Sequence, residues 1–398
     1  MRNHMFYRPL QESNLSVEAE TLNELKFLIR EEFEIDKAIR EKFPIELFGK
    51  PSDTLLIEGS KDVMECFKSI DAKKVDIKDK IKNIDHLGFD DGEIVLNFKD
   101  DDITATAVYD FTYDFFEDLF DMGKYSKFCR ENMLLDLTKL NVEWLFEKFN
   151  EKEMQYRLLN LGEEYFLRGI TSTVYKNYDN NLAIYIGFLA LHKFAAEMDV
   201  SFYIEKAYLS DSAISILFRQ LKPITIKGVG EVYFGAVLKN NEIRDSTFSL
   251  EFRYTVVNGN DSFSGIPTLR DAIFNIKHTS SIHTMETNVE KIYKMRELQD
   301  VMLSYIKQFS KLEKISKAEL YPLYTKVINA KSKLQSGTRT KVKEYYERDF
   351  VENTQSLIQI FSKITDFSVE IEEKLFLEHL YHEAITELIK KEKEKVGN

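Results

Sequence analysis

Residues 165–179 read YFLRGITSTVYKNYD, and residues 180–195, which follow directly, read NNLAIYIGFLALHKFA. The run Arg168–Ser172 lies where apolar and polar side chains alternate, which predicts a strand that enters a turn. Asn180 or Asn181 can cap the helix that follows. The apolar stripe of that helix includes Ile184, Phe188, Leu191 and Phe194. The chain is therefore expected to be organised around this strand–turn–helix unit.

Arg168 needs a partner for its charge, because arginine does not lose its proton in proteins and an unpaired buried charge is costly. One interpretation is a structural ion pair with Asp179 or Glu164. The other is contact with an anion beside Tyr175 and Tyr178. Arginine next to aromatic rings suits single-stranded nucleic acid, whose bases stack on rings and whose phosphates meet the cation.

Length and composition indicate a globular protein. The chain has 398 residues, of which 13% are aromatic and 31% are charged, and this length suggests two or three domains. No apolar run of about 18 residues and no signal-peptide core is present, so a cytoplasmic protein is expected. Cys66 and Cys129 lie far apart and match neither a disulfide framework nor a zinc pattern, so both are expected to be reduced thiols.

The charge is unevenly distributed along the chain. The formal net charge is −12, which argues against a protein that coats duplex DNA with its whole surface. Residues 1–170 carry −13, whereas residues 301–343 hold ten Lys and Arg against two acids. The basic residues predicted to contact nucleic acid in this part are Lys331, Lys333, Arg339, Lys341 and Lys343. The alternative is an ordinary solvated helix face.

The pattern of elements predicts an α+β protein, with a mainly antiparallel sheet, packed helices and a helical C-terminal region. Three regions are expected: an acidic α+β region at 1–110, a central α+β domain at 111–285 and a helical region with a basic patch at 286–398. Residues 111–160 are expected to be helical, with Trp144 as a core anchor. Strands are expected at runs that include Glu93–Phe98, Glu231–Leu238 and Ser246–Val257.

The spacing of apolar residues after residue 286 predicts a helical seam. Leu298, Met302, Tyr305, Phe309 and Leu312 follow a 4-3-4-3 spacing, which is typical of a helical hairpin or a coiled coil. Self-association through these C-terminal helices into a homo-oligomer is therefore a further expectation.

Catalytic signatures are missing from the sequence. It has no phosphate-binding glycine-rich loop, no nucleophile elbow and no HExxH motif. The acidic runs 90–93 and 100–102 suit solvated turns better than a metal site, because calcium-loop spacing is absent. We therefore expect no catalytic residues, no metal and no cofactor.

Two motifs, in order, resemble a known family. YFLRGITSTVYKNYDN and GAVLKNNEIRDSTFSLEFRYTVVNG, followed by IKHTSSIH, are similar to the phage/plasmid-like family of uncharacterised proteins from phages and mobile elements. The resemblance covers roughly residues 111–283. The chain departs from the family pattern at Asn241, where the family favours Ser, and at Arg244, where it favours Gly. The resemblance implies a phage or mobile-element setting and no established reaction.

These observations lead to two hypotheses of function. The first is a non-enzymatic phage or mobile-element protein that binds single-stranded nucleic acid in DNA metabolism, with strand annealing as one role. Its groove would be lined by Arg168, Tyr175, Tyr178, Arg244 and Arg253, with the 326–343 lysines as an outer rim. The second is a phage protein that inhibits a host defence factor, with the acidic first 170 residues as a decoy surface for a nucleic-acid-binding host protein. Neither hypothesis involves a membrane.

Overall fold

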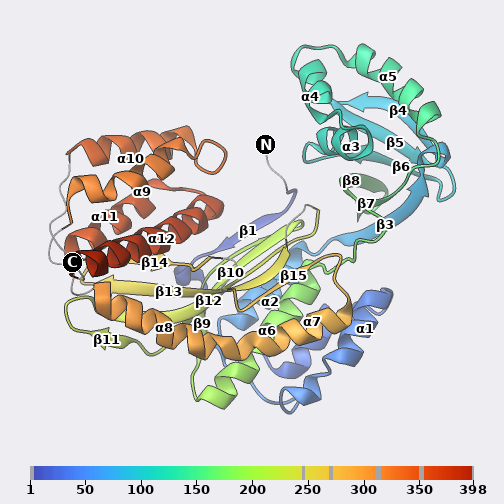
Figure 1. The fold of residues 1–398 in the computed structure, drawn as a ribbon. Coiled ribbons are helices and arrows are strands. Elements are labelled where there is room, and N and C mark those ends of the chain that lie inside the picture. The colour runs from blue at the N-terminus through green and yellow to red at the C-terminus, as the bar shows by residue number, and fades with distance from the viewer. Residues whose placement is uncertain (1–3, 244–246, 269–271, 310–314, 349–353, 397–398) are drawn as a thin grey trace.

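The computed structural model describes residues 4–243, 247–268, 272–309, 315–348 and 354–396. It confirms an α+β protein with largely antiparallel sheets and a helical C-terminal region. Two sheets are present in the described chain, one of nine strands and one of six. They lie at different ends of the molecule (Figure 1).

The larger sheet follows the order β1-β9-β10-β12-β13-β14, with β2, β11 and β15 attached at its sides. Its strands from β9 to β14 are antiparallel neighbours joined by short turns, such as the turn at Gly259, whose φ of 63° is easy for glycine. The strands are β1 (Tyr7–Leu10), β2 (Ile57–Glu58), β9 (Phe202–Ser210), β10 (Ala213–Gln220), β11 (Ile224–Ile226), β12 (Gly230–Asn241), β13 (Thr247–Asn258), β14 (Asp261–Gly265) and β15 (Phe274–Lys277).

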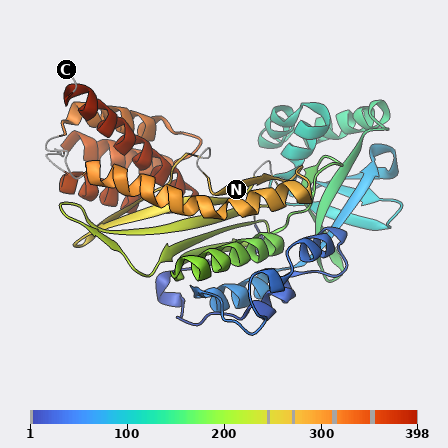
Figure 2. The same cartoon turned by 60° about the horizontal axis from the view of Figure 1, so that its bottom comes forward.

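Helix α6 (Asn180–Met198) covers one face of this sheet and is itself covered by N-terminal helices (Figure 2). Because it lies between two layers, α6 is buried on nearly all sides, and Gly187 lets it approach Leu238 of β12 closely. Asp179, rather than Asn180 or Asn181, is its N-cap residue. The N-terminal helices are η2 (Leu22–Leu28), which packs on α6, α1 (Glu34–Lys42), whose Asp36 accepts a hydrogen bond from Asn181, and α2 (Ser60–Ile70), which packs on β9 and β1.

The smaller sheet follows the order β3-β7-β8-β6-β5-β4, and helices α3, α4 and α5 pack with it. Its elements are β3 (Lys73–Lys80), β4 (Ile84–Asp90), β5 (Glu93–Phe98), β6 (Ile103–Ala107), α3 (Phe111–Phe120), α4 (Gly123–Glu131), α5 (Leu135–Lys148), β7 (Glu153–Leu161) and β8 (Glu164–Thr171). The predicted boundary between residues 110 and 111 falls inside this unit, because β6 pairs with β8. The prediction of helix up to residue 160 was wrong for β7.

Trp144 is not a core anchor, and this prediction was wrong. Its side chain is 78% exposed, whereas Thr138 and Val142 on the other side of α5 are buried. Spacing alone cannot tell an outward apolar stripe from an inward one.

Helices after residue 281 form the C-terminal region. They are α7 (Ile282–Val289), α8 (Lys294–Phe309), α9 (Lys317–Asn329), α10 (Ser336–Arg348), α11 (Thr354–Phe367) and α12 (Ile371–Val396). In this region α7, α11 and α12 pack on the larger sheet, and α9 and α10 pack on other helices. Phe263 of β14 contacts the rings of Phe309, Phe361 and Tyr381, which fixes α8, α11 and α12 over this strand. No helix in the described ranges has both the length and the apolar run needed to cross a membrane.

The predicted seam of α8 packs within the chain. Met302 and Phe309 are buried in the main core, and Leu298 and Tyr305 pack against it. Leu312 lies outside the described residues. Self-association through the C-terminal helices stays a prediction, and it would need a surface other than this seam.

Candidate nucleic-acid interface

The two motif stretches of the sequence meet in space at an ion pair. Arg168 of β8 lies 2.7 Å from a carboxylate oxygen of Glu242, which directly follows β12. Both side chains are fully buried. Arg168 also donates a hydrogen bond of 3.0 Å to the carbonyl oxygen of Asp211. The interpretation of Arg168 as a structural ion pair therefore holds, with Glu242 as its partner in place of Asp179 or Glu164.

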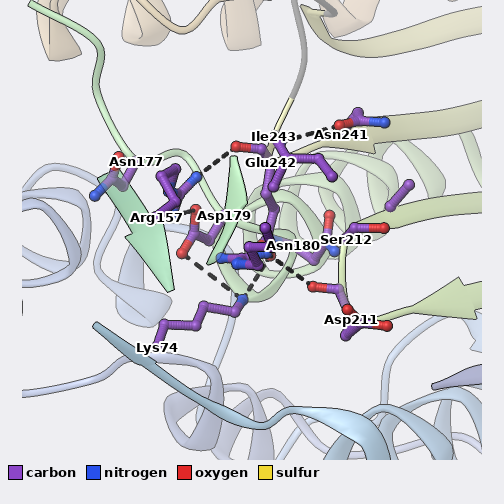
Figure 3. Close-up of polar contacts among 12 residues, drawn as sticks. Lys74, Arg157, Asn177, Asp179, Asn180, Asp211, Ser212, Asn241, Glu242 and Ile243 are labelled. Atoms are coloured by element: carbon purple, nitrogen blue, oxygen red, sulfur yellow. Dashed lines mark hydrogen bonds and ion pairs between the residues drawn. The ribbon is translucent and has the colours of Figure 1, made fainter. Parts of the chain in front are cut away.

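Glu242 is the centre of a larger polar network (Figure 3). Its carboxylate accepts from Lys74 Nζ at 2.5 Å and from the backbone N–H of Asn180 at 2.8 Å. Its carbonyl oxygen accepts from Arg157 at 2.5 Å and from the Tyr175 hydroxyl at 3.2 Å. Paired charges of this kind satisfy the rule that a buried charge needs partners.

Arg157 extends the network to two further carboxylates. It lies 2.9 Å from Asp76 and 2.7 Å from Asp179. Burial alone would raise the pKa of Asp179, but the positive charges of Arg157 and Lys74 outweigh it and hold that pKa well below its ordinary value. Asp179 is therefore ionised, and its charge suits the N-terminus of α6, where the helix dipole favours an anion.

The network joins the two sheets. Lys74, Arg157 and Arg168 come from β3, β7 and β8 of the smaller sheet, while Asp211 and Glu242 come from the ends of β9 and β12. A second contact across the same junction is the hydrogen bond from the Tyr109 hydroxyl to Asp211. These side chains are buried, so the junction is closed to a nucleic-acid strand in this structure.

Tyr175 and Tyr178 do not present free ring faces at this junction. The Tyr175 ring stacks on His278 with centroids 4.6 Å apart, and Tyr178 is fully buried. The Tyr178 hydroxyl donates to the carbonyl oxygen of Ser280 at 2.8 Å. Arg244, the neighbouring predicted residue, lies outside the described residues.

Arg253 lies far from Arg168 in a second buried cluster. It pairs with Glu205 at 2.8 Å and with both carboxylate oxygens of Glu378 at 2.9 Å, and it donates to the Ser264 hydroxyl at 2.7 Å. All of its terminal nitrogens are thereby engaged. Because only 3% of the residue is exposed, Arg253 holds α12 on the sheet and does not line an open groove.

The predicted lysines lie on the α9–α10 hairpin and are exposed. Lys331 and Lys333 are in the connecting turn, and Lys341 and Lys343 are on α10. Arg339 is half-buried and donates to the carbonyl oxygens of Leu334 and Ile328, at 3.2 and 3.3 Å, which stabilises the turn.

A surface with rings and positive charges lies along the same hairpin. Tyr321 of α9 is 58% exposed, and its ring lies 6.4 Å from that of Tyr346 of α10. Lys317 Nζ lies 4.7 Å from the Tyr346 ring centroid. Arg339, Lys343 and Tyr346 are spaced i, i+4 and i+7, so they share a side of α10. We call Lys317, Tyr321, Arg339, Lys343 and Tyr346 the α9–α10 face.

The sequence predictions missed several of these residues. Arg157 lies in the apolar run MQYRLLNL, and the logic applied to Arg168 applies to it equally. Tyr321 lies four residues after Lys317 and Tyr346 three residues after Lys343, and tyrosines so close to lysines are a signal for stacking beside phosphate contacts. Lys74 gave no signal, because the alternation in KKVDIKDK is that of any solvated strand.

No group of metal-ligating side chains that could hold an ion occurs among the described residues. The comparisons found no matching family model, no similar curated protein and no similar solved structure.

His278 should make stability depend on pH. Burial lowers its pKa to about 4, below the ordinary value near 6.5, so the folded state binds fewer protons than the unfolded state. Its contribution is therefore present above about pH 6.5 and is lost as the pH falls towards 4, with a total on the order of 3 kcal/mol. Urea unfolding across this range should show that loss, and His278→Gln should flatten it. An unchanged pH profile in the variant would contradict the assignment.

Proposed function

We propose that this protein binds single-stranded nucleic acid through the α9–α10 face. The observation that carries the proposal is the exposed Tyr321 ring beside Tyr346, with Lys317 over the second ring. An exposed ring next to cations matches the two demands of a single strand, which are stacking of bases and neutralisation of phosphates. The proposal includes no enzymatic step.

The surrounding charge supports this choice of surface. Although the whole chain carries −12, residues 301–343 hold ten basic residues against two acids. The buried Arg168 and Arg253 are engaged in ion pairs, so the proposed interface moves from the centre of the molecule to its C-terminal helices. The tyrosines also predict a preference for single strands over duplex, because bases inside a duplex are already stacked.

The setting of this function is also proposed. The resemblance of the two motifs to the phage/plasmid-like family supports a phage or mobile-element protein that acts in the cytoplasm, with strand annealing as one role. Inhibition of a host defence factor is the second candidate, and the net charge of −13 on the first 170 residues supports it.

Fluorescence anisotropy with a labelled oligothymidylate and a duplex of equal length tests the interface. We expect tighter binding of the single strand, and affinity that falls steeply with salt because counterions are released on binding. Tyr321→Ala should weaken binding about tenfold, since stacking of one base is worth on the order of 1–3 kcal/mol.

Lys341→Glu is the matched control for Lys343→Glu. Both lysines are exposed on α10, but residues 341 and 343 project from opposite sides of a helix with 3.6 residues per turn. Lys343→Glu should weaken binding and make the salt dependence shallower, whereas Lys341→Glu should have a much smaller effect. Equal effects of the two variants, or no salt dependence, would contradict the proposal.

A further inference from the structure

Helix α5 carries a line of apolar side chains on its outer surface. Three of these side chains follow a 3-4 spacing that places them along one side of α5, and a fourth lies in the turn just before the helix. We call them the α5 stripe: Met133, which is 94% exposed, Leu137 at 47%, Leu140 at 59% and Trp144 at 78%. Contiguous apolar surface of this kind marks an interaction site more often than scattered single residues do.

The core of the smaller sheet does not need this stripe. The opposite side of α5 supplies the buried Thr138 and Val142, and Leu145 and Phe146 pack against that core. Helix α5 lies at the outer end of the molecule, away from the larger sheet (Figure 1). The stripe thus remains open among the described parts of the chain.

The backbone at the start of the stripe also costs stability. Met133 has a φ of 60°, a left-handed conformation that is uncommon for residues with a side chain. A glycine or an asparagine would suit this turn better and would expose no apolar surface. The left-handed backbone and the exposed apolar side chain of Met133 both lower the stability of the folded protein. Because they do not serve the fold, they favour a role in binding for this side chain.

Acidic groups border the stripe and select the charge of its partner. Asp136, Glu143 and Glu147 are exposed and spaced i, i+7 and i+11, so they line one flank of the stripe. A hollow of about 380 Å³ at its N-terminal end is lined by Asp91, Asp136 and Met133 and also by Arg130, whose charge is paired with Glu93 and Asp110. The exposed acids of the flank favour a partner with basic side chains beside its apolar side.

We infer that the α5 stripe docks an amphipathic helix of another protein, whose apolar side is bordered by lysine or arginine. The 3-4 spacing of Leu137, Leu140 and Trp144 is the spacing with which two helices interlock side chains. A second copy of this chain is a poorer occupant, since antiparallel α5 helices would place the acidic flanks against each other. An anionic membrane is disfavoured for the same reason, because the flanking acids would face the lipid charges.

Trp144 is the only tryptophan of the chain, so its fluorescence reports the stripe directly. Full-length protein is titrated with two synthetic helical peptides that share a leucine stripe and carry either lysine or glutamate along its flanks. We expect the lysine peptide to shift the emission to shorter wavelength, to protect Trp144 from acrylamide quenching and to bind at least about tenfold more tightly than the glutamate peptide.

Two variants on α5 provide the matched comparison. Leu140→Glu should weaken binding of the lysine peptide at least about tenfold, whereas Lys139→Glu, an exposed position on the other side of the helix, should change it by less than about threefold. Both variants should melt with the native protein, because neither replaced side chain is buried.

Several outcomes would overturn the inference. If the two peptides bind equally well, or if neither binds, the inferred docking of a helix with basic flanks is contradicted. If Trp144 emission shifts with protein concentration alone, the stripe binds a second copy of the chain. If it shifts with phosphatidylserine vesicles but not with peptide, the stripe binds a membrane. Failure of nucleic-acid binding leaves this test unaffected, because the α9–α10 face lies on other helices.

Discussion

Replacement of Arg168 by alanine should lower the free energy of unfolding by about 3–5 kcal/mol, because it leaves a buried carboxylate with fewer partners. Glu242 would keep Lys74 at 2.5 Å but lose Arg168, and the Asp211 carbonyl oxygen would lose its donor. Urea unfolding followed by circular dichroism measures the loss. Arg168→Lys should recover only part of it, because lysine keeps the charge without the planar fork of donors.

An exposed arginine gives the control for this prediction. Arg8 lies on the edge strand β1, and Arg8→Ala should change stability by less than about 0.5 kcal/mol. The double variant Arg168→Met with Glu242→Gln should lose less free energy of unfolding than the sum of the losses in the two single variants, because each side chain is the partner of the other. If the Arg168→Ala protein melts like the native one but no longer binds nucleic acid, the result would instead support the predicted nucleic-acid groove at Arg168.

Strands could be predicted from the sequence where one face of the strand is exposed to solvent. Glu93–Phe98 was predicted with the bounds that β5 has, because buried and partly exposed side chains alternate along it. Strand β7 was missed, since its middle residues from Gln155 to Leu159 are buried on both faces and show no alternation. The error is thus a consequence of where β7 lies in the sheet.

Arg253 is buried in an ion pair instead of lining the predicted groove, for a different physical reason. Arg253 belongs to the polar side of β13, together with Glu251 and Thr255, and such a side normally faces solvent or a ligand. In this chain α12 covers that side, and Glu378, which is 125 residues away in sequence, supplies the partner. Local patterns carry no information on pairings over such a separation. The same limit explains why Glu242 was not foreseen as the partner of Arg168.

Arg253→Ala should also lower the free energy of unfolding by about 3–5 kcal/mol near pH 8, because Glu205 and Glu378 would be left without their cation. Without Arg253, burial would raise the pKa of the Glu205 carboxyl, which that arginine now holds below its ordinary value. A raised carboxyl pKa contributes stability that is present at low pH and is lost as the pH rises through the folded pKa. The difference in free energy of unfolding between Arg253→Ala and the native protein should therefore be smaller at about pH 5.5 than near pH 8.

The site of the damage distinguishes this variant from Arg168→Ala. Hydrogen exchange should accelerate in α12, since Glu378 is its anchor on the sheet, while β7 and β8 remain protected. Arg219→Ala is the matched control, because Arg219 and Arg253 both lie opposite Gly235 in one row across the same face. Arg219 is held between the rings of Tyr203 and Tyr233, with no ion pair among the described residues. Its replacement should give a deficit that does not shrink at low pH, and a deficit for Arg253→Ala that is likewise independent of pH would contradict the role of the two carboxylates.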